Sequence, residues 1–435
     1  MDSIIIELYK QFQKFPVITT DSRNCPAQSI FFALKGDSFD GNEYAHQALN
    51  KGCRLAVVDN ITLADSPGMI YVESVLSTLQ QLANYHRKQL NIPIIAITGS
   101  NGKTTTKELI ARVLSEKFSV QFTQGNLNNH IGVPLTLLKM DNTTTIGVVE
   151  MGANHPGEIK ELCEIAEPQY GLITNIGKAH IEGFGSYEGV RNTKKELYDY
   201  VISNKGTVFV NSDDSVLMDM SQQINRLTYG ANNNASVIGE KVIVDPYLRF
   251  SWRNNVADTS VFTICTQMVG KYNLDNYLAA ICIGKHFGIA EDNINAALSD
   301  YTPVNNRSQL IKGSSNQILM DAYNANPSSM KVAIENFMAI EHPLKVAILG
   351  GMRELGNISE IEHERLIQSI DFKQIKEVYL IGDEFNSISI NQQIHHYNSL
   401  AELIEHLQEQ PIKNSLILVK GSRGNKLETL LPYIQ

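Results

Sequence analysis

The chain has 435 residues, a length that favours two or three folded domains over a single core. Hydrophobic residues make up 43% of it and charged residues 19%, which is typical of a soluble globular protein. The formal net charge of −9 argues against nucleic acid or an anionic membrane as the general partner. An anionic substrate would therefore have to be bound by local basic side chains and backbone N–H groups.

No segment predicts export or membrane insertion. The N-terminus lacks the basic region and long apolar run of a signal peptide, and no stretch approaches the roughly 20 apolar residues of a membrane span. The cysteines lack C-x-x-C or metal-ligand spacing, which favours reduced thiols. They are Cys25, Cys53, Cys163, Cys265 and Cys282. We expect a cytoplasmic protein and, because nothing suggests an extended interface, a monomer.

Short strands at 29–34 and 55–59, with a helix at 43–51 between them, predict a small α/β domain over residues 1–82. A helix at 76–91 then leads into a buried strand at 94–97. Strands at 146–150, 171–175 and 207–211 alternate with helices at 104–117, 157–166 and 188–204. This alternation predicts a mostly parallel sheet with helices on both faces. Short alternating segments at 237–269 indicate an antiparallel edge, and a helix at 275–286 follows, which completes a central domain over 83–303.

A second alternation follows a boundary near Thr302-Pro303. Its strands are expected at 318–321, 346–350, 378–382 and 416–420, and its helices at 328–340, 360–370 and 400–408. The fold class is therefore α/β with three domains. They are a small N-terminal α/β domain, a central P-loop domain with a parallel sheet, and a Rossmann-like C-terminal domain over 304–435.

The segment from Thr98 to Thr105 lies between a buried strand and a helix, which is the context of a phosphate-binding P-loop. Glycines let backbone N–H groups turn toward phosphate oxygens, and the helix N-terminus adds partial positive charge. Lys103 would reach the terminal phosphates, and the Thr104 hydroxyl would complete an Mg²⁺ shell. Glycines that only cap a helix are the alternative, against which Lys103 and Thr104 argue. We expect ATP to contact Gly99, Ser100, Asn101, Gly102, Lys103, Thr104 and Thr105.

Ile97 stands where the common motif has its first glycine, so the loop has the shortened form G-x-x-G-K-T. This loop resembles that of the Mur ligase family, whose members form amide bonds with ATP, and the resemblance extends along the chain. Asp21-Ser22-Arg23, the run 31–36 and Asp40-Gly41 are similar to the family segment that holds the UDP part of a UDP-muramyl substrate, and the run 123–129 is similar to the family's asparagine-rich substrate and nucleotide loop. The resemblance implies substrate contacts from Ser22, Arg23, Lys35, Gly36, Asn126 and Asn129.

The family's metal and nucleotide residues also have counterparts. Glu150 and His180, at or after the ends of predicted strands, match its Mg²⁺ ligands. Lys194 matches a K-x-E-[IL] lysine that carries a carbamate formed from CO₂, although Lys195 or a merely solvated helix face is the alternative. The implied metal set is Thr104, Glu150, His180 and Lys194, and the implied catalytic set is Lys103, His180 and Lys194. Further nucleotide contacts implied are Asn273, Asn276, Arg307 and Asp321.

Three blocks in the last domain, at 321–330, 349–356 and 420–424, resemble the branch of the family that adds D-alanyl-D-alanine. They imply substrate contacts from Tyr323, Asn324 and Asn326. The implied reaction joins D-alanyl-D-alanine to UDP-N-acetylmuramoyl-tripeptide through an acyl phosphate, with release of ADP. Its product would be the UDP-MurNAc-pentapeptide precursor of peptidoglycan, which links the chain to cell wall synthesis, cell shape and cell division.

Two other functions stay open. One is a family member with a different amine acceptor, and the other is a regulatory subunit that binds nucleotide without turnover. The joint presence of Lys103, Thr104, Glu150, His180 and Lys194 argues against the second. The domain order further predicts that the last domain closes over the central one and excludes water from the acyl phosphate.

Overall fold

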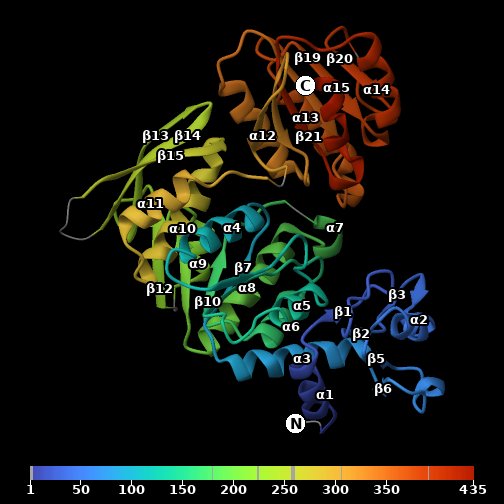
Figure 1. Cartoon of the computed structure of the whole chain (residues 1–435). Helices are drawn as coiled ribbons and strands as arrows, with labels where there is room; N and C mark the ends of the chain where they lie inside the picture. Colours follow the sequence, from blue (N-terminus) through green and yellow to red (C-terminus); the bar gives the residue numbers. More distant parts are fainter. Residues whose placement is uncertain (1–2, 179, 223–224, 256–259, 305, 390) are drawn as a thin grey trace.

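The computed structural model describes residues 3–178, 180–222, 225–255, 260–304, 306–389 and 391–435. Within them, sheets of four, nine and six strands follow one another along the chain and form an N-terminal, a central and a C-terminal unit. In Figure 1 the C-terminal unit lies at the top, the central unit in the middle and the N-terminal unit at the lower right. The expected three-part α/β fold is confirmed. Within this described part, every helix is too short or too polar to span a lipid bilayer.

The N-terminal unit is a parallel sheet of order β1-β2-β5-β6 with a small hairpin, β3–β4. Its strands are β1 (Ile18–Thr19), β2 (Ile30–Phe32), β3 (Lys35–Gly36), β4 (Phe39–Asp40), β5 (Leu55–Val58) and β6 (Met69–Tyr71). Its helices are α1 (Ser3–Lys14), α2 (Ala45–Asn50) and α3 (Val75–Leu90). Helix α1 is an addition to the sequence expectations, and it buries Ile5, Leu8 and Phe12.

Helix α3 joins the first two units. Ser74 caps its N-terminus with a hydroxyl that accepts a hydrogen bond from the Ser77 N–H, and Asn91 caps its C-terminus in the left-handed conformation. It contacts α1 on one side and central-unit helices α5 (Gly132–Leu137) and α6 (Glu158–Ala166) on the other. The expected division between residues 82 and 83 falls inside this single helix.

The central sheet has the order β15-β14-β13-β12-β11-β10-β7-β9-β8. Its strands are β7 (Ile94–Thr98), β8 (Val120–Phe122), β9 (Ile146–Glu150), β10 (Tyr170–Ile173), β11 (Thr207–Asn211), β12 (Asn225–Gly230), β13 (Val237–Asp245), β14 (Tyr247–Asn254) and β15 (Phe262–Val269). From β8 to β13 neighbouring strands are parallel, whereas β13, β14 and β15 are antiparallel. The expected antiparallel edge at 237–269 is therefore present, and its residues 256–259 lie outside the described ones.

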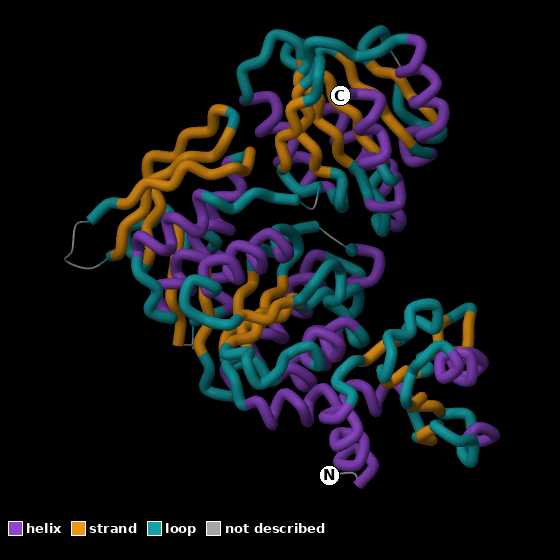
Figure 2. Tube along the Cα trace, in the orientation of Figure 1, coloured by secondary structure: helices purple, strands orange, loops and turns teal. Residues whose placement is uncertain are grey.

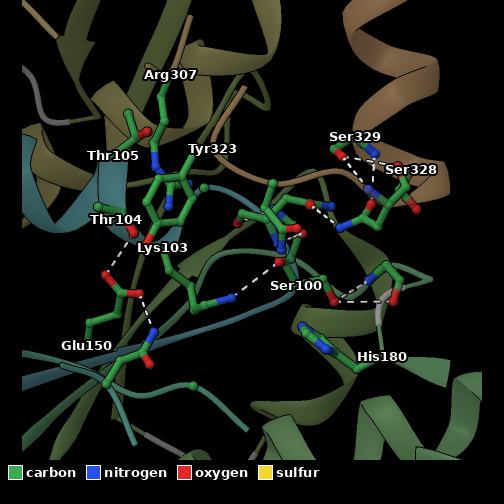
Figure 3. A pocket seen from close by; sticks show the side chains of 18 of the residues that line it. Ser100, Lys103, Thr104, Thr105, Glu150, His180, Arg307, Tyr323, Ser328 and Ser329 are labelled. Carbon is green, nitrogen blue, oxygen red and sulfur yellow. Dashed lines mark hydrogen bonds between the residues drawn. The ribbon is translucent and has the colours of Figure 1, made fainter. Parts of the chain in front are cut away.

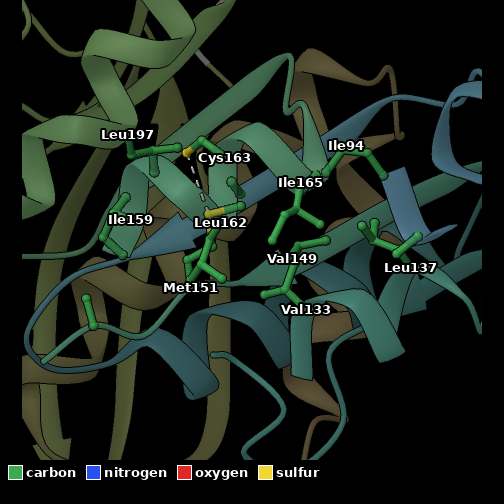
Figure 4. Packing of buried hydrophobic residues seen from close by; sticks show 14 of the residues in the cluster. Ile94, Val133, Leu137, Val149, Met151, Ile159, Leu162, Cys163, Ile165 and Leu197 are labelled. Atoms are coloured by element: carbon green, nitrogen blue, oxygen red, sulfur yellow. Dashed lines mark hydrogen bonds between the residues drawn. The ribbon is translucent and has the colours of Figure 1, made fainter. Parts of the chain in front are cut away.

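Helices cover both faces of the central sheet. Side chains along a strand alternate between the two faces, so one strand contributes to both hydrophobic clusters. In β7, Ile94 and Ala96 pack in one hydrophobic cluster and Ile95 and Ile97 in the other. The first cluster, part of which Figure 4 shows, includes α3, α5, α6 and α8 (Tyr187–Ser203). The second includes α4 (Lys103–Leu114), α10 (Leu274–His286) and α11 (Glu291–Ser299), while α7 (Ile181–Phe184) and α9 (Ser215–Met220) are short connecting helices.

The C-terminal sheet has the order β16-β17-β21-β18-β19-β20, with β16 antiparallel to β17 and the others parallel. Its strands are β16 (Gln309–Lys312), β17 (Gln317–Asp321), β18 (Lys345–Gly350), β19 (Glu377–Ile381), β20 (Ile394–Tyr397) and β21 (Leu416–Lys420). Helices α12 (Pro327–Ala339) and α13 (Ser359–Gln368) cover one face, and α14 (Leu400–Glu409) and α15 (Leu431–Ile434) cover the other. The trace in Figure 2 shows this sheet enclosed between helices. The expected division between residues 303 and 304 lies between α11 and β16.

Candidate active site

A cavity of about 680 Å³ lies between the central and C-terminal units. It opens at the carboxyl ends of β7, β9 and β10, the edge at which open α/β sheets bind ligands. The central unit contributes the loop from Ser100 to Thr105 together with Glu150 and His180, and the C-terminal unit contributes Tyr323 and Ser328 among others. Figure 3 shows these side chains converging from the two units.

The glycine-rich loop has the backbone that its sequence predicts. Gly99 has φ +136°, and a Cβ there would lie 2.0 Å from the Thr174 hydroxyl oxygen, so only glycine fits. Helix α4 begins at Lys103, and its first N–H groups have no partner within the helix. The Lys103 amine donates to the carbonyls of Gly99 (2.6 Å) and Ser100 (3.2 Å), and burial lowers its pKa. The loop therefore folds around its own lysine beside a helix N-terminus.

Glu150 holds a buried network at the end of β9. Its Oε2 accepts from the Thr104 hydroxyl at 2.9 Å and lies 3.6 Å from the Lys107 Nζ, while its Oε1 accepts from the Asn128 Nδ2 at 2.8 Å. Glu150 is 2% exposed and Lys107 1%, and burial lowers the pKa of Lys107. Lys107 and Asn128 were missed by the sequence analysis. The signal for Lys107 was its place one helical turn after Lys103, on the same face of α4.

His180 and Lys194 approach the site from α7 and α8. The His180 Nδ1 lies against the carboxylate of Glu354 from the C-terminal unit, and burial lowers the pKa of His180 in spite of that carboxylate. Lys194 is 2% exposed, and its Nζ lies 5.3 Å from the ring centroid of Phe184. Burial, and then the charge of Lys103, lower the pKa of Lys194 to about 7. Lys194 is not one of the residues that line the cavity.

Asn273 and Asn276 lie at the start of α10, under the glycine-rich loop. The Asn276 Oδ1 accepts from the Thr106 hydroxyl at 2.9 Å, and its Nδ2 donates to the Asn273 Oδ1 at 3.0 Å. The Asn273 Nδ2 donates in turn to the Val269 carbonyl at 2.8 Å. Both residues line the cavity, yet these contacts also tie α10 to α4 and so support the loop from below.

The C-terminal unit faces the loop with an aromatic and charged group. The Arg307 guanidinium lies 3.8 Å from the Tyr323 ring centroid, and an Arg423 nitrogen donates to the Tyr323 hydroxyl at 3.2 Å. The buried Lys420 donates to the Asp321 carboxylate at 2.6 Å and to the Asn324 carbonyl at 3.4 Å. Tyr323 is therefore held between two guanidinium groups at the cavity.

The residues expected to hold the UDP-muramyl substrate divide into two places. Asn126 and Asn129 line the cavity, and the Asn129 Oδ1 accepts from the Gly132 N–H at 2.9 Å. Ser22, Arg23, Lys35 and Gly36 lie on the N-terminal unit and do not line it. Arg23 pairs with Asp21 and Lys35 with Asp59, each at 2.9 Å, so both cations have carboxylate partners at the surface.

Three family models match the chain in order. They are the Mur ligase family catalytic domain over residues 14–99, the Mur ligase middle domain over 97–284, and the Mur ligase glutamate ligase domain over 306–423. The UDP-N-acetylmuramoyl-tripeptide–D-alanyl-D-alanine ligase of Bacillus subtilis is 34% identical over 426 aligned positions, and the alignment covers 95% of this chain and 92% of that protein. The enzyme of the same name from Escherichia coli is 32% identical over 430 aligned positions, and the alignment covers 96% of this chain and 93% of that protein.

Solved structures agree with the sequence comparisons. MurF from Acinetobacter baumannii is 27% identical with a TM-score of 0.87, over 98% of this chain and 97% of that one. MurF ligase from Thermotoga maritima, solved in complex with ADP, is 27% identical with a TM-score of 0.86, over 100% of this chain and 98% of that one. Since family models cover most of the chain and relatives above 30% identity span nearly all of it, this chain belongs to the Mur ligase family.

Proposed function

We propose that the chain is an ATP-dependent, ADP-forming ligase that joins D-alanyl-D-alanine to UDP-N-acetylmuramoyl-tripeptide. The observation that carries this proposal is the cavity in which a phosphate-binding loop faces the Tyr323 block of another unit. Nearly full-length similarity to ligases of that name supports the choice of substrates. The product is the UDP-MurNAc-pentapeptide precursor of peptidoglycan.

In this proposal the ATP phosphates lie on the loop from Gly99 to Thr105, at the N-terminus of α4. The ADP complex of the T. maritima relative supports a nucleotide here. Lys103 turns from its loop carbonyls toward the terminal phosphates, where its charge offsets the negative charge of the transferring group. Arg307 and Asp321 contact the nucleotide from the C-terminal side, while Asn273 and Asn276 hold the loop beside it.

The donor groups at the loop fit Mg²⁺, which prefers oxygen ligands and usually binds through one or two carboxylates together with substrate phosphates. The Thr104 hydroxyl and the Glu150 carboxylate are in contact, so one ion can reach both. In the described part of the chain no group of three or more His, Cys, Asp and Glu side chains is placed to hold a metal. When bound, Mg²⁺ supplies charge neutralisation for the phosphates.

Lys194 is proposed to carry a carbamate, and His180 to lie on the same side of the site. A lysine whose pKa is about 7 is about half in the neutral amine form at pH 7, whereas an ordinary lysine is almost wholly protonated there, and the neutral amine is the form that adds to CO₂. Addition converts a buried cation into a buried anion beside Lys103. The carbamate would then be a further oxygen ligand for metal near the phosphates.

The reaction begins when the tripeptide carboxylate attacks the γ-phosphorus of ATP, which breaks the bond to ADP and forms an acyl phosphate. The neutral amine of D-alanyl-D-alanine, held by Tyr323 and Asn324, then attacks the acyl carbon. Phosphate leaves, the nitrogen releases a proton to the solvent, and the amide forms. Ser22, Arg23, Lys35 and Gly36 hold the UDP end, and Asn126 and Asn129 hold the part nearer the loop. The enclosure between two units limits water, which would otherwise hydrolyse the acyl phosphate.

The test measures phosphate release by the purified full-length chain with ATP, Mg²⁺, UDP-MurNAc-tripeptide and D-alanyl-D-alanine. Phosphate release is expected only when all substrates are present. Mass spectrometry should then detect a product with the mass of UDP-MurNAc-pentapeptide. Lys103→Ala should lower kcat by about 100-fold or more, because charge stabilisation of the transferring phosphoryl group is lost. Lys139→Ala, at an exposed lysine of the same unit, is the control. Equal release with another amino acid in place of the dipeptide would overturn the substrate assignment.

A further inference from the structure

We infer that Asn326 is a positioning residue that couples docking of the C-terminal unit to the phosphate loop through a hydrogen bond to Asn101. The inference rests on the proposed function for its catalytic readout. It gives Asn326 a role different from the substrate contact expected from its sequence block. The contact joins residues 225 positions apart in the sequence.

Asn326 caps helix α12, and its side chain has partners at both ends. Its Oδ1 accepts from the Ser329 N–H at 2.9 Å, and its own N–H donates to the Ser329 hydroxyl at 3.0 Å. Its Nδ2 donates to the Asn101 Oδ1 at 2.8 Å. The cap fixes the direction of the amide, so this donor is aimed at the loop without a further loss of side-chain freedom.

Asn101 is fixed from the other side by the segment after β10. Its N–H donates to the Asn175 Oδ1 at 3.1 Å, and its carbonyl accepts from the Thr174 hydroxyl at 2.6 Å and the Asn175 Nδ2 at 3.0 Å. These bonds use the backbone of Asn101 and leave its side chain to the C-terminal unit. The residue two positions before Lys103 is therefore held by both units at once.

Neighbouring contacts place the same two units in register. The Ser328 hydroxyl accepts from the Lys178 N–H at 3.2 Å, and the Ser100 hydroxyl both accepts from the Gly177 N–H (2.8 Å) and donates to its carbonyl (3.2 Å). A shift of the α12 N-terminus would therefore displace the phosphate loop, both through Asn101 and through the segment after β10. The physical consequence is that the loop reaches its working shape only when the C-terminal unit is docked.

The experiment compares Asn326→Ser, Asn101→Ala and the double variant in the full-length chain. Serine is a good N-cap, so Asn326→Ser keeps α12 capped but cannot reach Asn101. Asn101→Ala leaves the backbone bonds of the loop in place. The control is Asn336→Ala on the same helix, because the Asn336 Oδ1 accepts from the Lys271 N–H at 2.9 Å and so also joins the two units, but away from the loop.

Each of the two single variants is expected to lower kcat by about 2- to 10-fold, the range of one hydrogen bond, with the KM for D-alanyl-D-alanine unchanged. The double variant should lose no more kcat than either single variant. In contrast, the fold-losses in kcat of Asn336→Ala and Asn101→Ala should multiply when the two are combined. A raised KM for the dipeptide in Asn326→Ser alone would overturn the inference and make Asn326 a substrate contact. The inference would also be overturned if the fold-losses in kcat of Asn101→Ala and Asn326→Ser multiplied in the double variant.

A second readout separates failure of this inference from failure of the proposed function. Affinity for a non-hydrolysable ATP analogue, measured by calorimetry on the same variants, does not depend on ligation. Weaker and non-additive binding in Asn101→Ala and Asn326→Ser supports the coupling even if no amide product forms. Binding that stays as tight as in the unaltered protein for both variants contradicts it. Unchanged melting temperatures confirm that the helix cap is intact.

Discussion

Lys194 and Lys195 are neighbours on α8, but they lie in opposite environments. Successive helical residues point about 100° apart, so one faces the interior and the other the solvent. Lys194 is buried near Phe184 and Lys103, and its pKa is lowered to about 7, whereas Lys195 pairs with Asp199 at the surface. Burial of Lys194 therefore favours the neutral form of its amine.

Lys194→Ala should lower kcat by about 10- to 100-fold, the usual cost of losing a residue that organises a metal site. Added bicarbonate should raise the activity of the unaltered protein, and a carbamate signal should appear in its ¹³C NMR spectrum with labelled bicarbonate but not in that of the variant. Lys195→Ala should stay within about 2-fold, because an exposed ion pair contributes little. Full activity of Lys194→Ala with no bicarbonate effect would remove the carbamate from the mechanism.

At the scale of elements, the first turn of α10 contains Asp275, a carboxylate whose charged form is disfavoured by burial. Burial, and then the neighbouring charge of Asp213, raise the pKa of Asp275 to about 6, which the Asn211 side chain opposes. The folded state thus binds this proton more tightly than the unfolded chain. The resulting contribution to stability is present at low pH and is lost as pH rises through about 6.

Asp275→Asn should therefore stabilise the protein at pH 7–8 by up to about 3 kcal/mol. The pKa of Asp275 is raised from 3.8 to about 6, and a pKa difference of one corresponds to about 1.36 kcal/mol. The gain should shrink as the pH falls below about 6, and it should vanish well below pH 3.8, where the carboxyl is protonated in both states. The measurement is the free energy of unfolding from urea titrations across this pH range. An equal gain at pH 4 and pH 8 would show that the buried charge is not its cause.

At the scale of the whole molecule, the segment after β10 forms the seam between the central and C-terminal units. Lys178 pairs with the largely buried Glu362 at 3.3 Å, and His180 lies against Glu354. Glu362 also accepts from Arg365 at 2.7 Å within α13. Glu354 and Glu362 of the C-terminal unit therefore hold the central-unit loop that carries His180, an expected metal ligand.

The double variant Glu354→Gln, Glu362→Gln should weaken docking of the C-terminal unit, because two charge-assisted contacts across the seam are lost. Small-angle scattering should give a larger radius of gyration than for the unaltered protein, and the KM for ATP should rise about 3- to 10-fold. Glu409→Gln, at an exposed position of the same unit, is the control. Superimposable scattering profiles for all three proteins would contradict a role of these carboxylates in docking.

The sequence by itself determined the three-part α/β arrangement, most of the longer helices, most of the inner strands and the place of the phosphate loop, but not edge strands such as β8, β16 and β20. These features depend on local periods of two or 3.6 residues and on glycines whose backbone only glycine adopts, such as Gly99. Helix α1 was missed because its run Ile4-Ile5-Ile6 is typical of a strand, and only packing of Leu8 and Phe12 against α3 and the first sheet makes it a helix with a buried face.

The tertiary structure alone decided which partner each site residue has. It paired Lys107 with Glu150, turned Lys194 rather than Lys195 inward, and brought Asn326 to Asn101. Such contacts join segments far apart in the chain, and no local periodicity encodes them, because they arise only when sheets and helices pack at one edge. The residue types at the site were thus set by sequence, while their protonation, orientation and partners were set by burial and by the docking of two units.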